Sequence, residues 1–293
     1  MAVNFNGLEA YVDEQRLPLI KKAVLGGKTI GMINLQTGVK KASALNLINV
    51  TPQIQAGNCG FSDAGSATLS QRVLNAELLK VNMEYCDKDF LQYWTNFEVR
   101  SISAGKENMP FEEYFTTSVI EGINEKMEKL VWTGDKDNAG EFDGLLTLLA
   151  GEDEVVSASG TGVYNAVKNA YKACPIEVLP KAVIFLGADS FRELMMEMVE
   201  KNYYHYPANG ADVQEFVLPG TNTKVVAVNG LNGTKKIVIA NPENLFFGCD
   251  MLDDMESFDF FYDRSSRTYK LVVSFNGGTQ VAYPNEVVVG TIA

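Results

Sequence analysis

The sequence predicts an α+β fold organised around one long helix. Three observations predict it. Residues 109–149, MPFEEYFTTSVIEGINEKMEKLVWTGDKDNAGEFDGLLTLL, have the pattern of a long amphipathic helix, a Gly/Asp-rich turn and a short apolar run. An α/β pattern follows in residues 151–255, and the rest of the chain is mostly strand-like. Helical and antiparallel strand regions that are separated along the chain in this way are typical of the α+β class.

The long helix has clear start, periodicity and stop signals. Asn108 can cap its amides, Pro110 is tolerated in the first turn, and Gly134 is a natural left-handed terminator. Between these signals the apolar residues recur at steps of three and four, which places them on one stripe of a helix: Phe111, Phe115, Val119, Ile123, Met127, Leu130 and Val131. The predicted helix has about 23 residues and is roughly 35 Å long. Gly122 in its middle costs about 1 kcal/mol relative to Ala, so we expect another backbone to approach the helix closely there.

Two segments before the long helix lack the composition of compact domains. Residues 1–36 predict an N-terminal arm with a weakly amphipathic helix from Leu8 to Leu25, followed by Gly26-Gly27. Residues 37–79 predict an extended two-stranded loop with a flexible tip, GNCGFSDAGSA. This loop has too few large apolar residues to pack alone, so it needs a partner, either its own body or a neighbouring subunit. Aromatic residues then predict a helix that docks on the long one: Tyr85, Phe90, Tyr93, Trp94 and Phe97, together with Leu91.

The region after the long helix begins with an α/β pattern. TGVYNAVKNAYKACP predicts a helix ended by Pro175, KAVIFLG a buried strand, and ADSFRELMMEMVEKNYYH a helix opened by Asp189 or Ser190. TKVVAVNG and KKIVIAN predict neighbouring strands joined by a tight Asn-Gly connection. The chain then ends in a predicted antiparallel sheet, with a turn at 276–278, built from SFDFFYD, RTYKLVVSF, TQVAY and EVVVG.

Composition limits the classes of function. With 293 residues, 46% of them hydrophobic and 10% aromatic, the chain can form a real core. No apolar run approaches the roughly 20 residues of a membrane span, and no signal peptide is visible, so we expect a soluble cytoplasmic protein without a membrane partner. The net charge of -12 disfavours adhesion to DNA or to an anionic membrane. The four cysteines have no paired spacing, which favours buried free thiols: Cys59, Cys86, Cys174 and Cys249.

The sequence nominates no catalytic, cofactor-binding or metal-binding residue. The single histidine, His205, lies in YYHYP without a nucleophile motif. The segment starting at Asp135 and Asp137 resembles a calcium loop, but Leu146 stands where the bidentate glutamate belongs, so a polar turn is the better interpretation.

Two further patterns fail in the same way. Gly26-Gly27-Lys28-Thr29 ends like a phosphate-binding loop, but Lys22 occupies the position of the first required glycine. The acidic pairs Asp153-Glu154 and Asp253-Asp254 are interpreted as solvated loop charges. The hypothesis is therefore a non-enzymatic protein with no cofactor.

The order of these segments resembles the major capsid proteins of tailed bacteriophages. The most specific part is Glu128 to Leu146, EKLVWTGDKDNAGEFDGLL, where a helix end, a glycine-bearing turn and a Gly-Leu-Leu step follow one another. KAVIFLGADSFRELMMEMVEKNYYHYP and NPENLFFGCD support the resemblance, which covers nearly the whole chain.

This resemblance implies a Hong Kong 97-type capsid fold with a long spine helix, an extended two-stranded loop, an α/β axial domain and an antiparallel peripheral sheet. The peripheral domain would comprise residues 80–150 and 256–293, and the axial domain residues 151–255. The loop at 37–79 would lie over a neighbouring subunit. The implied function is a structural virion capsid protein that assembles in the host bacterial cytoplasm, through pentamers and hexamers, into an icosahedral-type shell. The shell would enclose DNA without sequence-specific binding, and separate scaffold, portal and decoration proteins are possible partners.

Two departures from the family pattern produce further expectations. Some members cross-link their subunits through a lysine on the extended loop, but no lysine lies between Lys41 and Lys80, so we expect an uncross-linked shell. Only a short arm precedes the loop, which predicts either a processed chain or a separate scaffold, and Met1 favours the separate scaffold.

Three alternatives stay open. An encapsulin-type compartment would share the fold but enclose protein cargo. A tail-tube or other virion protein is disfavoured by the long helix. A cytoplasmic hydrolase would need two converging carboxylates with perturbed pKa values, and the sequence identifies no such pair.

Overall fold

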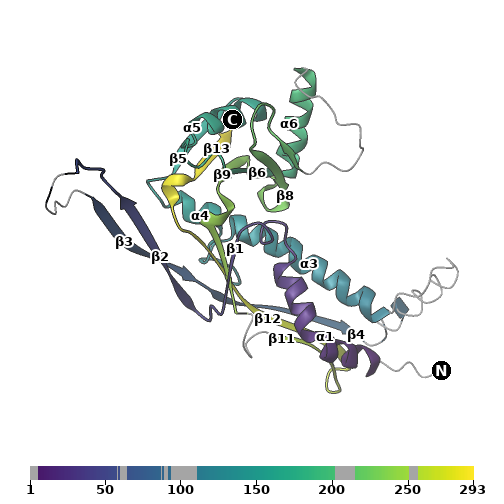
Figure 1. The fold of residues 1–293 in the computed structure, drawn as a ribbon. Coiled ribbons are helices and arrows are strands. Elements are labelled where there is room, and N and C mark those ends of the chain that lie inside the picture. Colours follow the sequence, from purple (N-terminus) through teal and green to yellow (C-terminus); the bar gives the residue numbers. More distant parts are fainter. Residues whose placement is uncertain are drawn as a thin grey trace.

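The structure is a computed structural model that describes residues 6–57, 59, 65–86, 88, 92–93, 111–201, 215–250 and 257–293. A long helix lies between two sheet regions, and a two-stranded hairpin projects from the body (Figure 1). The helices are α1 (Asn6–Leu25), α3 (Phe111–Thr133), α4 (Leu145–Ala150), α5 (Val163–Ala173) and α6 (Ala188–Glu200). Short 3-10 turns occur at η1 (Asn229–Leu231), η2 (Pro242–Asn244) and η3 (Pro284–Glu286).

The strands of the described residues form three separate sheets. A five-stranded sheet contains β1 (Asn34–Thr37), β10 (Leu245–Cys249), β12 (Thr268–Val281), β11 (Ser257–Asp263) and β4 (Glu77–Cys86). A six-stranded sheet has the order β5 (Val156–Gly160), β13 (Val288–Ile292), β9 (Lys236–Ala240), β6 (Val183–Gly187), β8 (Lys224–Val228) and β7 (Glu215–Val217). β2 (Ala42–Thr51) and β3 (Ser66–Asn75) pair only with each other.

The predicted long helix is confirmed as α3, which has 23 residues. Its apolar stripe is buried at Val119, Ile123, Met127 and Val131. The expected capping residues 108–110 lie outside the described residues. The expected left-handed stop at Gly134 is wrong, because its φ is not positive. A Cβ at this position would lie 2.3 Å from the Phe142 carbonyl oxygen, so glycine is needed here for a close approach of the turn that follows.

Gly122 does not have the close neighbour that the sequence predicted. No heavy atom lies within 4 Å of where its Cβ would be. The residue faces a groove of ≈ 670 Å³ between α3 and β4, lined also by Val119, Met127 and Val81.

The N-terminal helix is confirmed as α1, and it packs into the body of the protein. Val12, Ile20, Ala23 and Val24 are each no more than 1% exposed. They belong to the same apolar core as α3 and the strands β11 and β12. The amphipathic pattern is too weak to show this docking, since Pro18 and several polar residues interrupt it.

The C-terminal strands depart from prediction at a glycine pair. The expected turn at 276–278 does not form, and β12 runs without interruption from Thr268 to Val281. It pairs with β4 up to Gly277 and with β10 from Gly278 onward. Gly278 is needed because a Cβ there would lie 1.9 Å from the Asn75 carbonyl oxygen, where β3 passes into β4.

Replacing Gly278 with Ala should therefore disrupt this crossing. We expect a loss of more than about 3 kcal/mol in the free energy of unfolding, because backbone on both sides must shift. Gly122→Ala is the matched control, and it should stabilise the chain by about 1 kcal/mol because the helix position is open. Urea denaturation of both variants checks the pair, and equal stabilities would contradict the packing described.

The buried strand KAVIFLG is confirmed as β6, at the centre of a sheet that is covered on both faces. Phe185, Val226 and Val238 face the core shared with α3. Ile184, Leu186 and Ile239 face the second core beneath α5 and α6. Burial on both faces explains the continuous apolar run in the sequence.

Two predictions of strand pairing in this sheet are wrong. β8 and β9 are not neighbours, because β6 lies between them, parallel to β8 and antiparallel to β9. The last strand, β13, does not join the other C-terminal strands, and it pairs instead with β5 and β9. Hairpin signals report only contacts between neighbours in sequence, so insertion of a distant strand leaves no local trace.

The predicted helices α5 and α6 are confirmed, with a different start for α6. Its N-cap is Gly187, which makes no side-chain cap. The Asp189 carboxylate instead accepts hydrogen bonds from the amides of Ser190 and Gly233, both at 2.8 Å. The predicted aromatic helix falls largely outside the described residues, and Tyr85 lies in β4.

Candidate assembly surfaces

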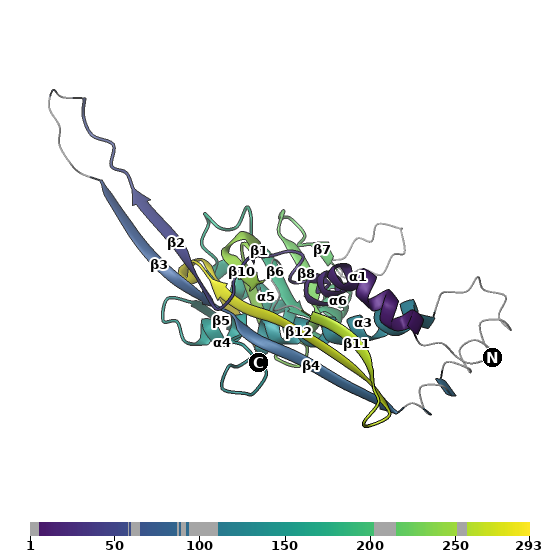
Figure 2. The same ribbon diagram turned by 90° about the horizontal axis from the view of Figure 1, so that it is seen from below.

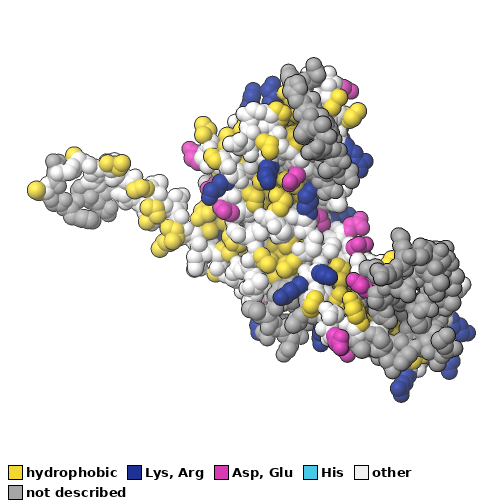
Figure 3. Space-filling view, turned by 45° about the vertical axis from the view of Figure 1, so that its right-hand side comes forward, with side chains coloured by type: hydrophobic (Ala, Val, Ile, Leu, Met, Phe, Trp, Pro, Cys, Tyr) yellow, Lys and Arg dark blue, Asp and Glu magenta, His cyan; other side chains and the backbone are white. Residues whose placement is uncertain are grey.

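The β2–β3 hairpin stands away from the body and exposes apolar side chains. Its base is anchored: Leu45 and Leu74 are buried, and the side-chain amide of Gln280 donates to the Val73 carbonyl oxygen at 2.7 Å. Farther out, Ile54 is 99% exposed and Leu69 is 76% exposed. Figure 2 shows β4 continuing the line of β3, and Figure 3 shows hydrophobic side chains along the hairpin. Exposed apolar residues on an unpartnered pair of strands mark a surface for protein contact.

A buried carboxylate joins the N-terminal segment to α3. Glu128 is 5% exposed and accepts hydrogen bonds from the Thr29 amide at 3.1 Å and from the Thr29 hydroxyl. The same hydroxyl accepts a hydrogen bond of 2.8 Å from the Trp132 indole N–H. Burial raises the pKa of Glu128 above its ordinary value, while the bonds from Thr29 and the charge of Lys28 act in the opposite direction.

The C-terminal half of α3 is also fixed against the six-stranded sheet. The rings of Trp132 and Phe185 lie 5.3 Å apart between centroids. A Cβ at Gly230 would lie 2.1 Å from the Glu128 carbonyl oxygen, so η1 packs directly on the helix backbone. Together with the Glu128 contacts, this packing holds the two sheet regions in one orientation.

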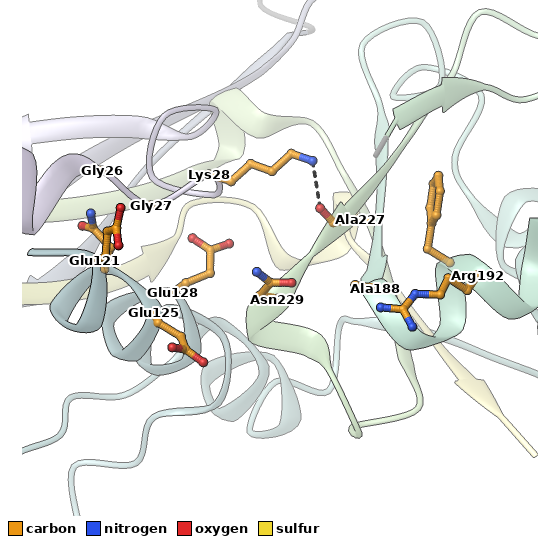
Figure 4. Close-up of a pocket in the computed structure, with 12 residues that line it drawn as sticks. Gly26, Gly27, Lys28, Glu121, Glu125, Glu128, Ala188, Arg192, Ala227 and Asn229 are labelled. Atoms are coloured by element: carbon orange, nitrogen blue, oxygen red, sulfur yellow. Dashed lines mark hydrogen bonds between the residues drawn. The ribbon is translucent and has the colours of Figure 1, made fainter. Parts of the chain in front are cut away.

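A polar cleft of ≈ 710 Å³ lies beside this junction (Figure 4). The carboxylates of Glu121, Glu125 and Glu128 come from α3, and Arg192 comes from α6 on the far side. The Lys28 ammonium donates a hydrogen bond of 2.9 Å to the Ala227 carbonyl oxygen. Among the described residues, no group of three His, Cys, Asp or Glu side chains is placed to bind a metal ion.

The motif-like segments of the sequence serve local structure. Gly26 and Gly27 allow α3 to approach closely, since Cβ atoms there would lie 2.4 Å from the Asn124 amide nitrogen and 2.8 Å from a Glu128 oxygen. The Asp135 carboxylate accepts from the Asp137 amide at 3.0 Å, as in an ordinary polar turn. His205 and the pair Asp253-Asp254 lie outside the described residues, and Asp153 and Glu154 are exposed.

The cysteine prediction is half correct. All four are free, and Cys174 and Cys249 are buried. Cys59, near the hairpin tip, and Cys86, at the end of β4, are exposed. The expectation of buried thiols therefore fails at these two positions.

Sequence reasoning missed Glu128 as a structural residue. Glu128 lies outside the apolar stripe listed for the long helix, where a solvent-exposed charge is expected, yet it is buried. Its only local signal is the neighbouring Trp132 one turn away, and its partner Thr29 is 99 residues distant in the chain. Within the described part of the chain, no helix combines the length and the apolar content needed to cross a membrane.

Several solved structures with a similar arrangement come from capsids and a virus-like particle. A chain of the satellite phage P4 procapsid, whose structure includes the size determination protein, is 13% identical, with a TM-score of 0.63 over 94% of this chain and 90% of that one. A capsid protein of an empty GTA particle is 9% identical, with a TM-score of 0.59 over 93% and 90%. The chain has the Hong Kong 97-type capsid fold. No protein-family model and no curated protein sequence matches it.

The likeness extends beyond phages. A virus-like particle from Pyrococcus furiosus is 12% identical, with a TM-score of 0.52 over 95% of this chain and 98% of that chain. At these identities the likeness establishes the fold, and it does so over almost the full length of each partner.

Proposed function

We propose that the chain is the structural major capsid protein of a tailed-phage-type virion, and that it assembles through pentamers and hexamers into a closed shell. The observation that carries the proposal is the projecting hairpin with exposed Ile54 and Leu69, set on a body with a capsid fold. A shell supplies the partner that these side chains lack, because each copy covers the hairpin of a neighbour and the contact repeats around a closed symmetry.

The proposal also assigns each segment of the chain to a part of the capsid subunit. Residues 37–79 lie over a neighbouring subunit, residues 80–150 and 256–293 form a peripheral domain, and residues 151–255 form an axial domain that meets its copies at the ring centres. Two strands cross these boundaries: β10, from residues 151–255, pairs with β12 of the last segment, and β13, from residues 256–293, pairs with β9.

The negative net charge of the chain supports a shell that encloses DNA without binding it tightly. The net charge of -12 gives no general attraction to phosphates, so packed DNA is confined rather than bound. Separate scaffold, portal and decoration proteins, and assembly in a host bacterial cytoplasm, belong to the same proposal.

Size-exclusion chromatography and negative-stain electron microscopy of the purified full chain test this function. We expect closed shells tens of nanometres across, or rings of subunits. A chain that stays monomeric at high concentration, with added salt and a crowding agent, would count against the proposal.

An encapsulin-type compartment, which would share this fold but enclose protein cargo, is the second candidate. The contents of the particles separate the two. Nuclease-protected nucleic acid in particles made during infection supports the phage capsid, whereas a single co-purifying protein cargo supports the compartment.

The shell should lack covalent links between subunits that run through the hairpin. No lysine lies between Lys41 and Lys80, so the hairpin offers no amine for an isopeptide bond. We expect one monomer band when assembled particles are boiled in detergent with reductant. A ladder of multimers that survives this treatment would contradict the prediction.

A further inference from the structure

A groove of ≈ 430 Å³ lies between α5 and α6 on the outer side of the six-stranded sheet. Its apolar lining includes Val167 and Tyr171 from α5 and Leu194 and Met198 from α6. This volume accommodates two or three apolar side chains from another protein surface.

The charged residues that line the groove are both positive. Lys168 and Lys172 are one turn apart on α5, and both are exposed. The ion pairs found among the described residues do not involve either lysine. At one end, the Lys201 ammonium lies 3.9 Å from the centroid of the Tyr164 ring, but the Glu197 carboxylate at 3.8 Å offsets its charge, so the local excess comes from Lys168 and Lys172. In a chain of net charge -12, this local excess favours an acidic partner.

The opposite side of α6 has the complementary character. Met196 is 63% exposed and Val199 is 55% exposed, which is unusual for apolar residues on a helix of the body. Glu193 and Glu200 flank them and are also exposed, and Arg192, one turn before Met196, places one positive charge on the same face. At about 100° per residue, Met196 points about 200° away from Leu194 and from Met198, which line the groove. The acidic apolar face and the groove therefore look in opposite directions from the same helix.

We propose that the face formed by Glu193, Met196, Val199 and Glu200 of one copy docks in the α5–α6 groove of the next copy in a ring. Met196 and Val199 enter the groove, and the two glutamates approach Lys168 and Lys172. Two different patches that face opposite ways give a head-to-tail contact, which closes into a ring when the rotation between copies allows it. The inference rests on the proposed function, because it assigns the contact that axial domains make around the ring centres.

Charge reversal on each side, and on both sides together, tests the contact in the full chain. The variants are Lys168→Glu with Lys172→Glu, Glu193→Lys with Glu200→Lys, and the combination of all four. The measurement is the fraction of protein in rings and shells by sedimentation velocity, at low and high salt. Lys21→Glu with Lys22→Glu on α1 is the matched control, since it changes the net charge as the first variant does while leaving the groove intact. Circular dichroism checks that each variant is folded.

We expect each reversal on one side to lower the assembled fraction by about tenfold or more, because like charges then meet across the contact. The combination should recover at least about half of the wild-type assembly, and the α1 control should assemble normally. One-sided variants that assemble like the wild type would overturn the inference, and so would a combination as impaired as its parts, since the groove would then hold another occupant.

The same experiment separates this inference from the proposed function. Normal shells from every variant would retain the function and reject the contact. Small rings that never close, but that are lost on charge reversal and regained in the combination, would retain the contact and reject the shell. A wild-type chain without any self-association would contradict both.

Discussion

Ile54→Asp should abolish assembly while leaving the fold of a single copy unchanged. Ile54 is 99% exposed, so within one copy the substitution removes no packing, and we expect a change in stability within about 0.5 kcal/mol. In the proposed shell a neighbouring copy would cover this side chain. Burying an isoleucine contributes about 1.5–3 kcal/mol, and an aspartate there must instead be desolvated at every copy of the interface.

The control for this prediction is Gln53→Asp, one residue away on the same exposed segment. It introduces the same charge without removing an apolar side chain, so we expect it to assemble at close to the wild-type level. Sedimentation velocity gives the assembled fraction of both variants, and thermal unfolding gives their stability. Shells formed by Ile54→Asp at the wild-type yield would show that the hairpin tip is not a contact surface.

Glu128→Ala should lower the free energy of unfolding by about 3 kcal/mol, because it leaves the buried Thr29 amide and hydroxyl without their acceptor. It also removes a contact that ties the N-terminal segment to α3. Glu125→Ala, the matched control on an exposed turn of the same helix, should change stability by no more than about 0.5 kcal/mol. Urea denaturation in the Ile54→Asp background, which keeps the copies apart, provides the measurement. Equal effects of the two substitutions on stability would contradict the structural role that we assign to Glu128.

The pH dependence of Glu128→Gln has a defined sign. Burial raises the pKa of Glu128, so the folded chain holds this proton more tightly than the unfolded chain. The stability that the protonated Glu128 carboxyl adds to the folded chain is present in full below the pKa of the unfolded chain. It is lost as pH rises through the pKa of the folded chain. Glutamine has no such titration, and the stability of the variant relative to wild type should therefore increase between pH 4 and pH 8, as measured by thermal unfolding. A difference that stays constant with pH, or that falls, would contradict the burial of an ionisable group at this site.

The sequence predicted those elements whose signals are local and strong. The apolar stripe of α3, the continuous apolar run of β6 and the extended segments of the hairpin were each recognised, and each is present. The helix α3 is buried along one stripe, β6 is buried on both faces, and the outer hairpin is buried on neither face. Each of these burial patterns can be recognised within a short stretch of sequence.

The errors have a common physical cause. Gly278 was interpreted as part of a turn, but it is required by the backbone of Asn75, which is distant in sequence. Likewise, β6 separates β8 from β9, and Glu128 is buried by Thr29. In each case the deciding partner lies far away in the chain, so local composition could not identify it. The candidate assembly surfaces follow the same rule: the lysine-free hairpin was visible in the sequence, whereas the α5–α6 groove required the fold.

Cryo-electron microscopy of assembled particles tests the central proposal most directly. We expect a closed shell in which the β2–β3 hairpin of each copy lies on a neighbouring copy, with Ile54 and Leu69 covered, and in which residues 151–255 surround the ring centres. A closed particle whose hairpins point into solvent, or a reconstruction of isolated single copies under assembly conditions, would contradict it.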